Sequence, residues 1–199
     1  MTNQYEKIIQ QNLIRIYQKE PTTLEANLAG KRKDNHFYFK AFGKDCCLTP
    51  EGIMISGSPE TGPQGLLISL YALNAGPAAI QMTPFKAFKD LPNSMPYHGA
   101  FSMNSERPLI PYVSRLENAQ ERIKAVFYGE NAPKGTPGDF AFVIYPLPMI
   151  ALCYIFYRTD DEFPASCICL FSANAIDYMP IDGLADVGEY TSKRLIELI

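Results

Sequence analysis

The side chains best suited to acid–base chemistry lie in two short segments of this sequence. Asp160, Asp161 and Glu162 form its densest charge cluster, directly followed by Phe163. Adjacent carboxylates can bind a hard cation, or share a proton so that one pKa rises. His98 is one of only two histidines, and an imidazole can exchange protons near neutral pH. The alternative for the acidic cluster is an exposed hairpin tip that keeps a hydrophobic hairpin in solution.

The segment around His98 is the second candidate feature. Residues Pro92 to Phe101 show no periodicity and are rich in Pro, Asn, Ser and Gly, which predicts a long loop. An aromatic ring, an imidazole and a flexible glycine at Tyr97-His98-Gly99 suit a lid that closes over a ligand. The alternative is a surface loop whose aromatic rings fill the core.

A binding site is expected where this loop meets the acidic turn, because pockets combine apolar walls with a few converging polar groups. The predicted ligand-binding residues are Tyr97, His98, Phe101, Asp161, Glu162 and Phe163. The preferred function is a small-molecule or cofactor-binding accessory domain. An enzyme is the alternative, with Glu162 or Asp161 as general base and His98 as its partner. The sequence assigns no catalytic residue and identifies no ligand or cofactor.

The five cysteines do not have the spacing of a metal site. They stand as Cys46-Cys47, as Cys167-x-Cys169, and as Cys153 alone, whereas zinc and iron–sulfur sites use repeated C-x-x-C pairs. We therefore expect buried structural thiols and no metal site. A hairpin turn centred on Asp160-Asp161 would place Cys153 opposite Ile168, facing away from the other pair. The chain also lacks G-x-S-x-G, Walker, G-x-G-x-x-G and H-E-x-x-H motifs.

Length and composition limit the class of protein. The 199 residues, 47% of them hydrophobic, predict a single domain over 1–199 with a sizeable core. A net charge of -3 argues against nucleic acid as a partner. Phe140 to Tyr157 carries no charge, but Pro146 and Pro148 favour two buried strands over a membrane helix. An odd cysteine count and no N-terminal export signal predict a cytoplasmic protein.

The elements that would position these residues predict an α+β fold. Amphipathic helices are expected at Asn3–Lys19 and after Pro180, and a strong helix over Pro63–Asn74. Alternation over 36–42, with two short strands after it, predicts a small N-terminal meander. The main antiparallel sheet comes from the C-terminal half, from runs at 140–145, 149–157 and 165–171. Helices from both ends would flank the two sheets.

Part of the chain resembles a known family. The likeness covers Leu66 to Tyr190 and is carried by LLISLYALNAG, FKAFKDLPNSMPYHGAF and GDFAFVIYPLPMIALCYIFYRTDDEFPASCICLFSANAIDYMPIDGLADVGEY. These stretches resemble the domain of unknown function 3786 family, most distinctively at Asp160–Pro164. Two positions depart from its pattern: Met149 replaces a frequent arginine, and Ser172 replaces a frequent aspartate.

The resemblance implies a type of metabolism but no specific biochemical activity. Members of the family occur in anaerobic bacteria and archaea, and some carry a fused four-iron–four-sulfur domain. This implies redox or one-carbon metabolism. It also gives a further alternative for this chain, a protein-interaction module that docks on an iron–sulfur protein partner.

Overall fold

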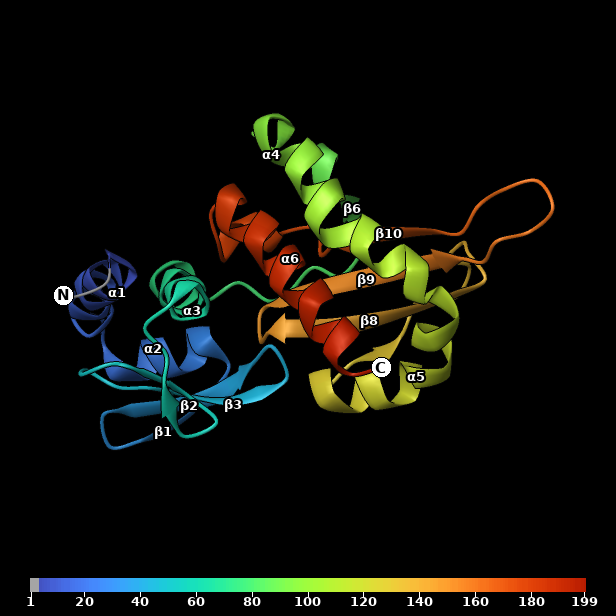
Figure 1. Cartoon of the computed structure of the whole chain (residues 1–199). Coiled ribbons are helices and arrows are strands. Elements are labelled where there is room, and N and C mark those ends of the chain that lie inside the picture. Colours follow the sequence, from blue (N-terminus) through green and yellow to red (C-terminus); the bar gives the residue numbers. More distant parts are fainter. Residues whose placement is uncertain (1–3) are drawn as a thin grey trace.

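The structure is a computed structural model that describes residues 4–199. Helices and two five-stranded antiparallel sheets make up the fold (Figure 1), so the predicted α+β class is confirmed. The N-terminal sheet has the order β1-β2-β3-β4-β5, and the C-terminal sheet has the order β6-β10-β9-β8-β7. Among residues 4–199, no helix is both long and apolar enough to cross a membrane.

The N-terminal sheet is a meander covered on one face by three helices. Its strands are β1 (Lys31–Lys33), β2 (His36–Ala41), β3 (Lys44–Leu48), β4 (Ile53–Ile55) and β5 (Ser58–Pro59). The covering helices are α1 (Gln4–Ile16), α2 (Pro21–Leu28) and α3 (Pro63–Asn74) (Figure 1). Phe39 of β2 packs on Tyr71 of α3 with ring centroids 6.0 Å apart. The predicted strands and α3 are confirmed, because their periodic apolar positions do face this core.

The C-terminal sheet forms the centre of the other half. Its strands are β6 (Lys86–Ala87), β7 (Glu130–Asn131), β8 (Phe140–Leu147), β9 (Ile150–Tyr157) and β10 (Ser166–Phe171). Helices α5 (Val113–Phe127) and α6 (Ile181–Glu197) lie over one face (Figure 1). Against the other face pack Ile80, Met82 and Phe85, from the segment that follows α3. Helix α6 contributes the buried residues Leu184, Val187 and Leu195.

The β9–β10 hairpin has a register that differs from the symmetric turn expected. Cys153 pairs with Leu170 rather than Ile168, while Cys169 pairs with Tyr154. The pairing is shifted by two positions, and an even shift leaves each side chain on the same face of the sheet. Cys153 therefore faces away from Cys167 and Cys169, a question that the sequence left open because it depends on the register of the hairpin.

The segment predicted as a long loop is mostly helical, and that prediction is wrong. Residues Met95–Phe101 form α4, which continues through a π-helical turn (η2, Ser102–Glu106) and a 3₁₀ segment (η3, Arg107–Tyr112) into α5. Pro96 stands in the first turn of α4, where a missing N–H removes no hydrogen bond. Upstream of α4, Thr83 and Pro84 join through a cis peptide bond, and the strand β6 and a 3₁₀ turn (η1, Phe88–Asp90) follow.

One continuous cluster of buried side chains joins the two sheets. At their junction the backbone N–H of Phe42 donates to the carbonyl of Pro146 over 2.6 Å. Phe42 directly follows the last residue of β2, Ala41. Pro146 lies in the stretch of β8 where the pairing with β9 becomes irregular. The junction fixes the N-terminal sheet against the end of β8.

Candidate functional site

The residues predicted on the long loop lie on α4, and they differ sharply in burial. Phe101 is 2% exposed and stacks on Phe88, with ring centroids 4.3 Å apart and planes 8° apart. It also contacts Phe171 at 5.6 Å. Tyr97 is 39% exposed, and His98 is half-buried with its Nδ1 atom enclosed and unpartnered. Phe101 is therefore a core residue, which agrees with the core-filling alternative for this segment.

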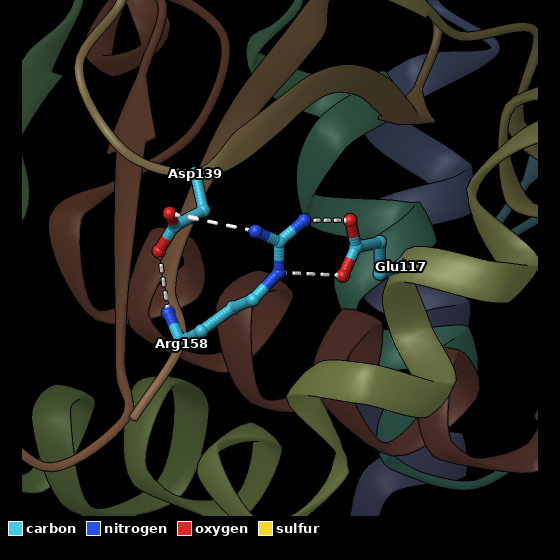
Figure 2. Close-up of polar contacts among 3 residues, drawn as sticks. All are labelled: Glu117, Asp139 and Arg158. Atoms are coloured by element: carbon cyan, nitrogen blue, oxygen red, sulfur yellow. Dashed lines mark hydrogen bonds and ion pairs between the residues drawn. The ribbon is translucent and has the colours of Figure 1, made fainter. Parts of the chain in front are cut away.

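The acidic turn between β9 and β10 is an exposed tip on an anchored base. The guanidinium of Arg158, at its start, lies between two carboxylates (Figure 2). Its Nε donates to Oε2 of Glu117 over 2.9 Å, a second nitrogen pairs with Oε1, and Asp139 lies on the other side at 3.7 Å. The Arg158 hydrogen bond lowers the pKa of Glu117. These contacts tie the base of the turn to α5.

At the tip, one of the three carboxylates closes the turn. Oδ1 of Asp160 accepts hydrogen bonds from the backbone N–H groups of Glu162 (2.9 Å) and Phe163 (2.7 Å). These two bonds lower the pKa of Asp160. Asp161 and Glu162 are exposed, and the ring of Phe163 is 66% exposed. This is the solvated hairpin tip that the sequence allowed as an alternative.

The structure does not bring the two groups of predicted residues together. Phe101 packs at Phe171, the last residue of β10, whereas the acidic turn precedes Ser166, the first. Six residues of strand separate these points by roughly 17 Å. Figure 1 shows α4 and the β9–β10 turn at different ends of the C-terminal sheet. The prediction of one shared pocket is therefore corrected, and His98 has no Asp161 or Glu162 partner.

A different group of polar and aromatic side chains gathers on the outer face of the N-terminal sheet, opposite its helices. His36, Tyr38 and Lys40 alternate along β2 with three buried residues. Cross-strand pairing adds Cys47 of β3 and Lys31 of β1, both directly opposite Tyr38. Opposed residues of antiparallel strands project to the same face. Strand alternation thus collects these five side chains on one surface.

The β2–β3 turn brings an aromatic ring from the other half of the chain to this surface. Phe42 and Gly43 form a two-residue turn with φ values of 51° and 73°, as a type I′ hairpin requires. A Cβ atom on Gly43 would lie 2.5 Å from Cγ1 of Val126, so glycine permits close contact with the end of α5. Tyr128 follows α5 in the left-handed conformation. Its ring centroid lies 5.8 Å from Nζ of Lys40.

Together these elements enclose a cavity of about 1090 Å³. This volume lies slightly above the range typical of small-molecule sites, roughly 300–1,000 Å³. Its walls combine the outer face of the N-terminal sheet with residues near the junction of the two halves. The functional side chains that line it are Lys31, His36, Tyr38, Lys40, Asp45, Cys47, Thr49, Met54, Tyr128 and Tyr145. We call this cavity the tyrosine groove.

Hydrogen bonds and burial keep the polar groups of the groove in defined states. Nζ of Lys40 lies 2.7 Å from Oδ1 of Asp45, and this hydrogen bond raises the pKa of Lys40. A hydrogen bond with Cys47 raises the pKa of Tyr38. Burial raises the pKa of Tyr145, whose hydroxyl donates to Oε1 of Glu130 over 2.6 Å. Both phenols are therefore neutral at physiological pH.

Cys47 lines the groove and differs from the other four thiols because it is only half-buried. Cys46, Cys153, Cys167 and Cys169 are buried, and burial raises the pKa of each thiol, that of Cys153 to about 11. No cluster of three or more His, Cys, Asp or Glu side chains within residues 4–199 is arranged to hold a metal ion. The thiols remain free.

Sequence reasoning missed the tyrosine groove, although one signal pointed to half of it. The aromatic–polar alternation over residues 36–42 predicted a half-exposed strand, and therefore an outward-facing His36 and Tyr38. Nothing local indicates that Tyr128 and Tyr145 return to this face from about a hundred residues away.

The comparison with family models identifies the chain. The model "Domain of unknown function (DUF3786)" matches residues 20–194, and the chain belongs to this family. The match includes the β9–β10 hairpin, the strands of the tyrosine groove and Tyr128. No curated protein and no solved structure matches the chain.

Proposed function

We propose that this chain is a small-molecule-binding domain and that its ligand occupies the tyrosine groove. The observation that carries the proposal is a cavity of about 1090 Å³ with exposed aromatic rings on two sides. Tyr38 is 41% exposed and Tyr128 is 64% exposed. Large exposed rings at a concave surface are typical of ligand sites, because they lose water-exposed area when a ligand binds.

The scaffold supports binding without a large rearrangement. Tyr38 stands on a central strand of the N-terminal sheet, with paired neighbours on both sides. Tyr128 is fixed by the α5 terminus and by Gly129, where a Cβ atom would lie 2.3 Å from the carbonyl of Val143. Rings held on rigid elements lose little conformational entropy on binding, which favours affinity.

The alternatives have less support. An enzyme using Asp161 or Glu162 with His98 would need these side chains within hydrogen-bond reach, and they lie at different ends of a strand. A docking module would favour a flat apolar patch. The groove is concave and carries charged groups among its rings, which favours a small ligand. We also propose that this domain acts in redox or one-carbon metabolism, as the resemblance to the family implies.

The proposal is tested by titrating ¹⁵N-labelled protein with indole, naphthol and naphthoate while recording amide chemical shifts. We expect at least one probe to shift amides of β2, β3 and the residues around Tyr128. Replacing Tyr38 with alanine should weaken binding by about tenfold, since stacking on one ring contributes roughly 1–3 kcal/mol.

The matched control is Tyr97→Ala, which removes a tyrosine of similar exposure from α4. It should leave probe affinity unchanged. The proposal fails when all three probes leave the groove amides unperturbed, or when Tyr38→Ala binds them as tightly as the unmodified protein.

A further inference from the structure

Lysines border the aromatic row of the tyrosine groove. On β1, Lys31 is directly opposite Tyr38 and Lys33 is directly opposite His36. Directly opposed residues project to one face, so both ammonium groups lie on the side of the rings. All three residues of β1 are exposed. Lys40 adds a third ammonium group beside Tyr128.

The three ammonium groups are not equally neutralised. Lys40 is paired with Asp45 at 2.7 Å. Within the described part of the chain, neither Lys31 nor Lys33 has a carboxylate within ion-pair distance. Asp34 acts on Tyr38 through its charge, and Glu130 accepts the hydrogen bond of Tyr145 on another wall of the groove. The ammonium groups without a paired carboxylate, those of Lys31 and Lys33, therefore lie together at the β1 edge, although the whole chain carries -3.

We infer that the ligand of the tyrosine groove is a planar aromatic compound with an anionic substituent, such as a carboxylate or phosphate. This inference rests on the function proposed above. The ring system stacks on Tyr38 and Tyr128, and the anionic group lies toward Lys31 and Lys33.

Geometry gives the anion a defined end of the groove. Asp45 already pairs with Lys40 near the β2–β3 turn, so a second carboxylate there would meet like charge. At the β1 edge the lysines have no such partner. An anionic substituent therefore points from the rings toward β1, away from the turn.

The test compares two ligands that differ in charge, the naphthoate anion and neutral naphthol, by calorimetry at neutral pH. We expect naphthoate to bind about fivefold more tightly, the preference that one partly exposed charge contact confers. The preference should shrink in high salt, because exposed charges are screened. Lys31→Gln should abolish most of it.

Lys89→Gln is the matched control, because it removes an exposed lysine of η1 that lies outside the groove. It should leave the preference intact. Equal or tighter binding of naphthol, with groove amides shifted by both compounds, overturns the charge inference and leaves the binding function standing. Failure of both compounds, and of indole, overturns the two together. Far-ultraviolet circular dichroism verifies that Lys31→Gln is folded, as expected for an exposed edge residue.

Discussion

Replacing Phe101 with alanine separates a core role from a binding role for α4. Phe101 is 2% exposed, and its ring contacts Phe88 at 4.3 Å and Phe171 at 5.6 Å. Removing a buried phenylalanine side chain costs about 3–5 kcal/mol, through lost transfer free energy and the cavity left behind. Because two aromatic contacts are lost together, we expect about 4 kcal/mol.

The assay is urea denaturation followed by circular dichroism, with thermal unfolding as a second measurement. For a protein of this length, 1 kcal/mol shifts Tm by roughly 2–4 °C, so Phe101→Ala should lower it by about 8–16 °C. Phe101→Leu keeps most of the volume and should cost less than about 1.5 kcal/mol. Tyr97→Ala, on the exposed side of the same helix, should change stability by less than about 1 kcal/mol.

Two results would refute this reasoning. One is a cost for Phe101→Ala no larger than that for Tyr97→Ala, which would mean that the ring is not packed as described. The other is a loss of probe binding in the folded Phe101→Leu protein, which would return Phe101 to the ligand site.

Two further predictions concern single side chains. Iodoacetamide applied to the native protein at neutral pH should modify Cys47 alone, because burial protects the other thiols and raises the pKa of Cys153 to about 11; peptide mass spectrometry that finds Cys153 modified as fast as Cys47 contradicts this. Arg158→Ala should lower the urea midpoint at pH 7 but not at pH 2.5. The reason is that Arg158 lowers the pKa of Glu117 in the folded protein. The ion pair therefore stabilises the fold at pH values above the pKa of Glu117 in the unfolded chain, and this stabilisation is lost as the pH falls through its pKa in the folded protein. Equal losses at both pH values would show that Arg158 acts through packing.

The parts of the fold that the sequence predicted depend on local periodicity. Residues 36–42 and 140–157 alternate or run apolar, and α3 presents apolar positions at helical spacing, so each element is specified by its own residues. The loop prediction for Pro92 to Phe101 is wrong because proline and glycine do not interrupt a helix at every position. Pro96 occupies a first helical turn, and burial of Phe101 stabilises a helix of low intrinsic propensity.

The site could not be predicted to the same extent, because it depends on contacts between distant segments. The acidic cluster stands out in the sequence, yet Asp160 uses its carboxylate to close the turn. Tyr128 looks like the end of a helix until Gly43 places the β2–β3 turn against Val126. Density of charge along the chain therefore indicates a closed turn here, whereas the exposed rings of the groove come together only in the folded structure.

The tight fit of the Phe42–Gly43 turn against α5 means that the groove exists only in the completed fold. Residues between Ala29 and Gly57 contribute one wall, and the opposite ring comes from Tyr128. A chain with either half unfolded lacks one wall of the groove. Any compound that spans Tyr38 and Tyr128 therefore binds the native state alone, and by mass action it protects both halves against unfolding at once.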